Sequence, residues 1–249
     1  MKIIYLDRVS STNNYASSQL SSQEVLEGTI FLTFRQTRGK GQAHNVWESE
    51  DFMNLTFSLI LKPDFLLASS QFLISQMVAT GIVAAIERLS VDVMIKWPND
   101  ILFGNKKLGG ILIENSIMGS QIAWSVVGIG LNVNQVHFGN YKPEAISLKQ
   151  ILGRDVDSEA LLFSIYDEIM RRYHWIKQGN EMAVTSFYFK KLFRMGEWWR
   201  YRVEATEFDA RITGTDEFGR LRLEDRNGII THWPFKGIEM VWDSERAKE

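Results

Sequence analysis

The run Lys96-Trp97-Pro98-Asn99-Asp100, with Lys107-Leu108-Gly109-Gly110 seven residues after Asp100, is the stretch that decides the interpretation of this sequence. Residues 91–96 have the composition of a strand, which stops at Pro98 because proline cannot donate to a sheet ladder. The two lysines can flank a phosphate as point charges, and Asp100 can hold a hydrated Mg²⁺. The alternative interpretation is an ordinary strand–turn–strand hairpin with a salt bridge at its surface.

Two polar segments precede this run. Ser10-Ser11-Thr12-Asn13 follows a short strand and offers small hydrogen-bonding groups to an uncharged polar ligand, although the same residues can simply cap a helix over residues 14–19. The loop Arg35–Trp47 contains two glycines, which let its backbone approach a ligand, and it carries cationic side chains nearby. A solvated surface turn would have the same composition.

A fourth segment comes after the stretch that contains Lys96 and Lys107. Its sequence is Gly128-Ile129-Gly130-Leu131-Asn132-Val133-Asn134. Glycines and asparagines at the end of an apolar strand usually mark only a turn. The glycines can also keep the floor of a binding site flat, with Asn132 donating to a ligand or to the backbone. Together the four segments provide cations, one carboxylate and neutral hydrogen-bonding groups but no nucleophile, which favours direct attack of a bound carboxylate on the α-phosphate of ATP.

Hydrophobic patterns predict the elements around these segments. Gly28–Phe34 is typical of a buried strand, Asn54–Ile60 alternates like a half-buried strand, and the uncharged stretch from Phe65 predicts a buried helix that ends near Ser90. Two more strands, Lys107–Glu114 and Gln121–Val127, flank a turn at Gly119. Helices follow over Ser158–Gln178, with Ser158 as N-cap, and over Glu181–Met195. Short strands beyond these helices predict a small β-barrel in a second domain, which gives domains of residues 1–195 and 196–249.

Composition excludes several classes of site and protein. The 249 residues include no cysteine, which excludes disulfides, thiolate metal sites and cysteine nucleophiles, and suits a reducing cytoplasm. The formal net charge of −2, without a basic cluster, predicts no nucleic-acid or membrane partner. The sequence also contains no Walker loop and no Gly-x-Ser-x-Gly elbow, and its four histidines are too scattered for a zinc pair.

The segments, in this order, resemble the catalytic module of biotin protein ligases from about residue 5 to the end of the chain. The resemblance implies an α+β fold, with a mixed sheet and flanking helices related to class II aminoacyl-tRNA synthetases, followed by an SH3-like β-barrel. It implies an enzyme that joins biotin to ATP, with Mg²⁺, and then transfers biotin to a lysine of a biotin carboxyl carrier domain. The Ser-Thr-Asn segment begins at Ser11, so we expect a monofunctional ligase without an N-terminal winged helix.

The resemblance also implies residue roles. Contacts to biotin are expected from Ser11, Thr12, Asn13, Gln36, Gly110 and Lys107. Contacts to the nucleotide or adenylate are expected from Gly39, Lys40, Gly41, Gln42, Trp47, Asn99 and Asn132. Lys107 and Lys96 are the expected catalytic cations, Asp100 the metal ligand, and residues 135–145 a flap over adenine.

The glycine-rich loop departs from the family pattern. Many members have Gly-Arg-Gly-Arg-x-Gly-Arg here, whereas this chain has lysine, glutamine and asparagine at the three arginine positions, Lys40, Gln42 and Asn45. This departure affects the expected retention of the adenylate. A lipoate–protein ligase and a non-catalytic sensor of biotin or its adenylate remain as alternative functions, while octanoyl transfer through an acyl-cysteine is excluded. A homodimer is a further expectation.

Overall fold

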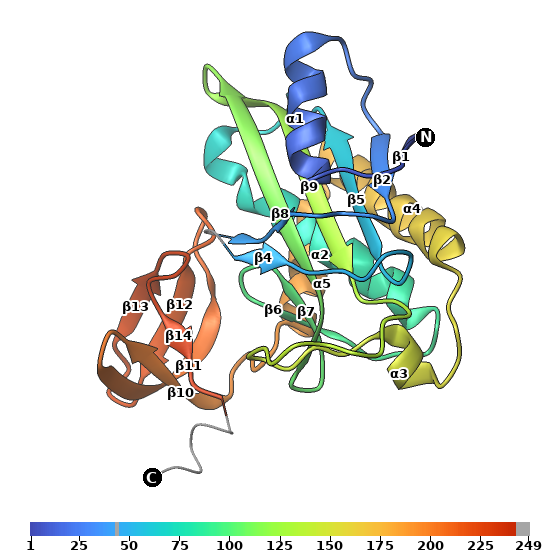
Figure 1. Cartoon of the computed structure of the whole chain (residues 1–249). Helices are drawn as coiled ribbons and strands as arrows, with labels where there is room; N and C mark the ends of the chain where they lie inside the picture. Colours follow the sequence, from blue (N-terminus) through green and yellow to red (C-terminus); the bar gives the residue numbers. More distant parts are fainter. Residues whose placement is uncertain (43–44, 243–249) are drawn as a thin grey trace.

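The computed structural model describes residues 1–42 and 45–242 of the chain (Figure 1). Its strands are β1 (Lys2–Leu6), β2 (Thr29–Thr33), β3 (Gly39–Lys40), β4 (Val46–Trp47), β5 (Leu55–Leu61), β6 (Met94–Lys96), β7 (Asp100–Phe103), β8 (Lys106–Met118), β9 (Gln121–Leu131), β10 (Trp198–Val203), β11 (Thr206–Thr215), β12 (Leu221–Asp225), β13 (Ile230–Trp233) and β14 (Glu239–Met240). Its helices are α1 (Thr12–Ser22), α2 (Phe72–Glu87), α3 (Leu148–Leu152), α4 (Ser158–Lys177) and α5 (Glu181–Lys191), with a short 3-10 turn over Ala68–Ser70.

A seven-stranded mixed sheet forms the larger unit, in the order β1-β2-β5-β9-β8-β7-β6. Only the β1–β2 pair is parallel. Helix α1 packs on one face over β2, β5 and β9, while α2, α4 and α5 cover the opposite face (Figure 1). The expected mixed sheet with flanking helices is therefore confirmed.

Strand β5 lies between β2 and β9 in this sheet, and its burial differs from the expected pattern. Its seven residues are all buried, whereas the alternating pattern predicted exposure of one face. Leu55, Phe57 and Leu59 enter the core against the α2 side. Thr56 and Ser58 lie on the other face, which α1 covers near Ser58. The polar alternation therefore marks a face that other parts of the protein cover instead of a face in contact with solvent.

Helix α2 is buried, as its uncharged sequence predicted. By length and composition, residues Ala68–Glu87 could cross a membrane, but 67% of the apolar window is buried inside the protein. Helix α4 buries the predicted stripe of Leu161, Ile165, Ile169, Tyr173 and Ile176. Its N-cap is Asp157 and not Ser158, because the carboxylate of Asp157 accepts from the backbone N–H groups of residues 159 and 160.

Several element boundaries differ from the expected ones. Strands β8 and β9 are longer than predicted and form a hairpin whose turn contains Gly119 at φ +63°. Strand β6 ends at Lys96 as predicted but begins at Met94 instead of residue 91, because its short antiparallel partner β7 pairs with it only from Met94 to Lys96. Helix α5 stops at Lys191 instead of Met195, because Leu192 is extended and Phe193 donates its backbone N–H to the carbonyl of Ile95 beside β6.

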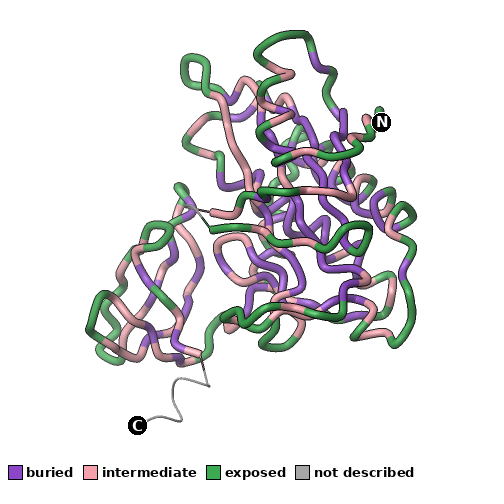
Figure 2. Tube along the Cα trace, in the orientation of Figure 1, coloured by how far each residue is buried: buried purple, intermediate pink, exposed green. Residues whose placement is uncertain are grey.

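The C-terminal β-unit, residues 198–240, is a five-stranded antiparallel sheet in the order β13-β12-β11-β10-β14. Its interior is formed by Trp199, Tyr201, Ala210, Ile212, Leu221 and Leu223. Figure 2 shows buried chain within this unit as well as within the larger one. The small β-structure expected after the helices is confirmed, with β10 beginning at Trp198 and β14 as a strand that the sequence patterns did not predict.

Candidate functional site

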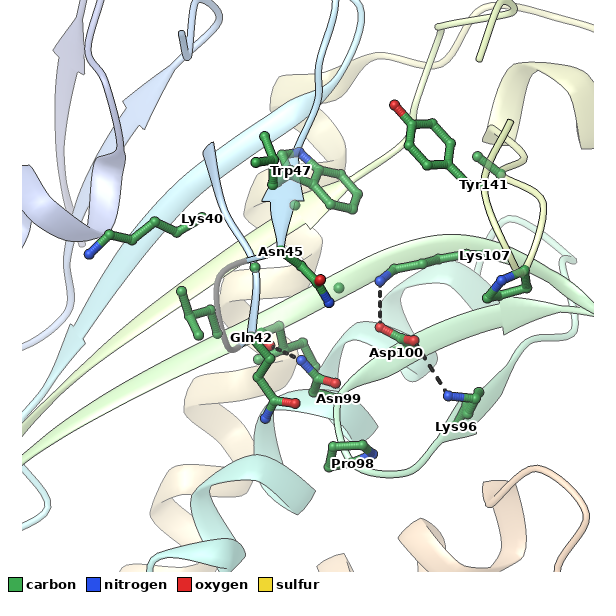
Figure 3. Close-up of a pocket in the computed structure, with 18 of the residues that line it drawn as sticks. Lys40, Gln42, Asn45, Trp47, Lys96, Pro98, Asn99, Asp100, Lys107 and Tyr141 are labelled. Carbon is green, nitrogen blue, oxygen red and sulfur yellow. Dashed lines mark hydrogen bonds and ion pairs between the residues drawn. The ribbon is translucent and has the colours of Figure 1, made fainter. Parts of the chain in front are cut away.

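A cavity of about 900 Å³ lies where the β3–β4 hairpin, residues 138–145, the β6–β7 turn and the C-terminal β-unit meet over the sheet (Figure 3). The structure brings all but one of the predicted site residues into its wall. Those that line it are Ser11, Thr12, Asn13, Gln36, Lys40, Gly41, Gln42, Trp47, Lys96, Asn99, Asp100, Lys107, Gly110 and Asn132. Gly39 does not line the cavity.

Lys96, Asp100 and Lys107 form one charged cluster in this cavity (Figure 3). Lys96 and Asp100 pair across the β6–β7 turn, and Asp100 pairs with Gly110 of β8. The Nζ of Lys107 lies 2.7 Å from Oδ1 of Asp100, and the Nζ of Lys96 lies 3.8 Å from Oδ2. Because Asp100 is buried, the interpretation as a hairpin with a surface salt bridge is wrong.

The cluster holds two lysines against one carboxylate, so it attracts anions. Burial lowers the pKa of Lys96, and the neighbouring Asp100 carboxylate partly opposes that change. Gly110 keeps space beside the cluster: a Cβ at this position would stand 3.5 Å from the Nζ of Lys107 and 3.8 Å from Oδ1 of Asp100. A phosphate or carboxylate can therefore approach the two ammonium groups closely.

Two predicted asparagines hold backbone in place around the cluster. The amide of Asn99 donates to the carbonyl of Ile111 at 2.7 Å, while the backbone N–H of Ile111 donates to the carbonyl of Asn99. The buried amide of Asn132 donates to the carbonyls of Lys107 and Ile146, at 3.3 and 3.2 Å. Both side chains thus fix the chain on either side of Lys107, and their expected nucleotide contacts stay predictions.

The Ser11–Asn13 segment caps α1 and lines the cavity at the same time. The hydroxyl of Ser11 accepts from the backbone N–H of Asn14 at 3.4 Å, as a helix cap does. The backbone N–H of Thr12 donates to Oε1 of Gln36 at 2.9 Å. Ser58 of β5, which the sequence patterns did not single out, lies 2.8 Å from the hydroxyl of Thr12. The structural and the binding interpretations of this segment are therefore compatible.

Glycines 128 and 130 make room for two of the predicted site residues. A Cβ at Gly128 would stand 2.3 Å from Oδ1 of Asn13, and a Cβ at Gly130 would stand 2.4 Å from the Trp47 ring. Both distances are impossible contacts, so the backbone of β9 must lack side chains there. The expected flat floor is instead filled by these two side chains, and Gly130 seats the β3–β4 hairpin on the sheet through Trp47.

The glycine-rich loop is a short hairpin in which Gly39 pairs with Trp47 and Lys40 with Val46. The polar and cationic side chains of this loop have different surroundings. Arg35 pairs with Asp7 and Asp51, at 3.7 and 3.6 Å. Lys40 and Gln42 line the cavity. His44, one of the four scattered histidines, lies outside the described residues together with Ala43.

One further part of the cavity wall belongs to the expected flap, and another was missed by the sequence patterns. Tyr141, within the expected flap, donates its hydroxyl to Glu48 at the end of the hairpin, and this hydrogen bond raises the pKa of Tyr141 to about 12. The C-terminal β-unit contributes Tyr201, Arg202, Lys236, Glu239 and Met240, and Trp242 follows directly after it. No local pattern points to these residues, because only the packing of the two units brings them to the cavity.

Asp100 was the expected ligand of Mg²⁺. Its two oxygens already face lysines, and among residues 1–42 and 45–242 no three His, Cys, Asp or Glu side chains gather as a metal-binding group. Protein-bound Mg²⁺ keeps several waters and takes one or two carboxylates together with substrate phosphates. The residues present therefore do not fit a metal held by the protein alone, and the role of Asp100 stays a prediction.

Residues 5–132 match the model of the biotin/lipoate A/B protein ligase family. The bifunctional ligase/repressor BirA of Bacillus spizizenii is 32% identical over 231 residues, which are 91% of this chain and 70% of the relative. The biotin–[acetyl-CoA-carboxylase] ligase of Paracoccus denitrificans is 28% identical, over 90% of this chain and 94% of its own. The biotin protein ligase of Aquifex aeolicus, solved with biotin and ATP, superimposes with a TM-score of 0.80 at 26% identity, covering 96% of this chain and 98% of that one.

Proposed function

Because the chain belongs to the biotin/lipoate A/B protein ligase family, we propose that the cavity is where it joins biotin to ATP. The chain is a biotin protein ligase, since relatives with that activity in their names match it over 90% or more of its length. The assignment of the site rests on one observation. Lys96 and Lys107 both face the carboxylate of Asp100, next to a wall of neutral hydrogen-bonding groups.

In the first step the carboxylate of biotin attacks the α-phosphorus of ATP. The bond to the β-phosphate oxygen breaks, pyrophosphate leaves, and biotinyl-5′-AMP remains. Negative charge gathers on the oxygens around the α-phosphorus during this step. Lys107, whose ammonium faces the cavity beside Gly110, neutralises that charge, and Lys96 attracts the phosphates from the other side of Asp100.

In the second step the amine of an acceptor lysine attacks the carbonyl carbon of the mixed anhydride. An amide forms, the amine loses a proton, and AMP leaves. The chain contains no cysteine to form an acyl-enzyme, so it acts by positioning and by charge neutralisation. We expect the acceptor to be a biotin carboxyl carrier domain, because the relative in Paracoccus denitrificans is named for a carboxylase.

The biotin end of the cavity is the wall formed by Ser11, Thr12, Asn13 and Gln36, which suits an uncharged cyclic urea. The nucleotide end lies toward the β3–β4 hairpin, with Trp47, and toward residues 138–145. Mg²⁺ that entered with ATP would be held by phosphates and waters, and it would supply positive charge to the leaving pyrophosphate. The reaction assigned to the chain's own residues does not depend on a metal site in the protein.

Four further expectations belong to this proposal. We expect residues 1–195 to form the catalytic unit and residues 196–249 a second unit, of which residues between Tyr201 and Trp242 line the cavity. The lack of cysteine fits a reducing cytoplasm, and the net charge of −2 fits a protein without nucleic-acid or membrane partners. A homodimer is an expectation that gel filtration with light scattering can test.

ATP–pyrophosphate exchange tests the proposed function. The purified chain should exchange labelled pyrophosphate into ATP only when biotin is present. Exchange with lipoate in place of biotin would indicate a lipoate ligase, and biotin binding without exchange would indicate a sensor. Biotin transfer to a carrier domain, followed by mass spectrometry, then tests the second step.

A further inference from the structure

Ser58 is a fully buried hydroxyl in strand β5, whose only other polar residue is Thr56. A buried hydroxyl is costly unless it is hydrogen-bonded. Its Oγ lies 2.8 Å from the hydroxyl of Thr12 and 2.6 Å from Oδ1 of Asn13. A serine hydroxyl has a single proton, so it can donate to only one of these two neighbours. The direction of that proton determines what Thr12 offers to the cavity.

The amide of Asn13 fixes this direction. Its Nδ2 donates to the backbone carbonyl of Leu112 at 3.2 Å and to a carboxylate oxygen of Glu114 at 2.8 Å. Both neighbours are acceptors, so this end of the amide must be the NH₂ group, and both of its hydrogens are used. The oxygen of Asn13 therefore faces Ser58 and can only accept. Gly128 allows this close fit, since a Cβ there would stand 2.3 Å from that oxygen.

These contacts determine which group donates and which accepts in the hydrogen bonds that link Thr12, Ser58 and Asn13. Ser58 donates to Asn13, so Ser58 must accept from the hydroxyl of Thr12. The hydroxyl of Thr12 then has no proton left for the cavity and presents only lone pairs. Its backbone N–H is also used, by Oε1 of Gln36 at 2.9 Å.

We propose that Ser58 and Glu114 are positioning residues that, through Asn13, hold the Thr12 hydroxyl as a pure hydrogen-bond acceptor, which selects a ligand with an N–H donor at this point. This inference rests on the proposed function, in which the donor is a ureido N–H of biotin. Neither Ser58 nor Glu114 needs to touch the ligand. Without them the Thr12 hydroxyl rotates freely and competes with the ligand as a donor.

A double-mutant cycle on the full chain tests this coupling, with biotin dissociation constants measured by calorimetry. Ser58→Ala should weaken biotin binding between about two- and tenfold, the effect of one neutral hydrogen bond. In a Thr12→Val background, Ser58→Ala should have no further effect, because the hydroxyl that it orients is gone. Equal losses in both backgrounds would mean that Ser58 has only a structural role, and would overturn the inference.

Glu114 provides a second test that does not depend on the folding of the Ser58 variant. Glu114→Leu removes the acceptor and should weaken biotin binding several-fold, whereas Glu114→Gln keeps an acceptor oxygen and should bind biotin more tightly than the leucine variant. In steady-state assays the loss should raise KM for biotin and leave kcat and KM for ATP unchanged. Equal biotin affinity for the Gln and Leu variants would contradict the role of Glu114.

Ser125→Ala is the matched control. Ser125 is a fully buried serine of the adjacent strand β9, and its hydroxyl has no hydrogen-bond partner among the residues that the structure describes. This variant should bind biotin like the wild type. Failure of the wild type to bind biotin would contradict the proposed function itself. A wild type that binds biotin, with a Ser58→Ala variant of equal affinity, would contradict only the inference.

Discussion

The indole Nε1 of Trp97 donates a hydrogen bond of 2.9 Å to the backbone carbonyl of Gly219, across the junction between the seven-stranded sheet and the C-terminal β-unit. The Trp97 ring also packs against Phe235, with 5.4 Å between centroids. Gly219 has φ +81°, and a Cβ there would collide with Phe72. Trp97 stands directly between Lys96 and Pro98, so the residue that docks the C-terminal β-unit is part of the turn that carries Lys96.

Trp97→Phe should therefore affect both stability and catalysis. The substitution keeps an aromatic ring against Phe235 but leaves the buried carbonyl of Gly219 without its donor. We expect the free energy of unfolding to fall by about 1–3 kcal/mol. We also expect KM for ATP to rise, because the C-terminal residues that line the cavity lose a fixed position relative to Lys96. Denaturant unfolding and steady-state kinetics measure the two effects.

Trp233→Phe is the control for this prediction. The indole of Trp233 donates to the hydroxyl of Thr231 at 2.8 Å, within the C-terminal β-unit, and neither residue lines the cavity. This control variant should lower the free energy of unfolding by a similar amount, on the order of 1–3 kcal/mol, without the rise in KM for ATP. A rise of equal size in both variants would show that general destabilisation, and not the junction, determines KM.

Lys107→Ala should slow formation of biotinyl-adenylate by a factor of about 10²–10³, by analogy with the loss of one transition-state hydrogen-bond donor. Biotin binding should change much less, because Lys107 acts on charge that develops in the reaction. Single-turnover adenylation and biotin calorimetry separate the two effects. Lys106→Ala is the matched control, since Lys106 pairs with Glu144 at the surface, at 2.8 Å. Weaker biotin binding with unchanged single-turnover adenylation would refute the assigned role.

The local parts of the site were predictable from sequence, and the parts made by packing were not. The Pro98 turn and the glycine-rich loop combine unusual residues within a few positions, and almost all of their predicted members line the cavity. Ser58 lies in a strand whose alternation resembles that of any half-exposed strand, so its role depends on α1 covering it. The hydrogen bond between Trp97 and Gly219 joins residues that are 122 positions apart, so no local sequence pattern could predict it.

The lowered pKa of Lys96 predicts opposite effects of alkaline pH on stability and on ATP binding. Between the lowered folded value and the ordinary value of 10.5, the unfolded chain binds more protons at Lys96 than the folded chain does. The contribution of Lys96 to the free energy of unfolding therefore rises with pH across this window. The contribution to ATP binding falls across the same window, because the ammonium that attracts phosphate is lost.

Two substitutions separate these effects. Lys96→Met removes the titrating group, so the alkaline rise in unfolding free energy, compared with the wild type, should disappear from denaturant titrations at successive pH values. Lys96→Arg keeps a charge at every accessible pH, so its KM for ATP should rise less in alkaline solution than that of the wild type. Parallel pH profiles of KM for the Arg variant and the wild type would assign the alkaline loss to another group.

The side chain at position 42 should affect how long the chain retains biotinyl-adenylate. It lines the cavity near the tip of the β3–β4 hairpin, where many family members carry arginine. Two other cations of the loop are poorly placed to replace that charge. Arg35 is paired with Asp7 and Asp51, and the ammonium of Lys40 points away from the Asp100–Lys107 pair in Figure 3. A neutral amide holds a phosphate more weakly than a guanidinium does.

Gln42→Arg should therefore slow the release of preformed biotinyl-adenylate several-fold, corresponding to about 1 kcal/mol for one improved contact. Rapid mixing of the loaded enzyme with excess unlabelled biotin and ATP measures the release rate. Gln23→Arg is the control, because it adds the same charge at the exposed end of α1, away from the cavity. Slower release in the Gln42 variant alone supports the role of this position. Equal or faster release would mean that Lys40, which lines the same cavity, already supplies the charge, and Lys40→Ala should then accelerate release in the wild-type background.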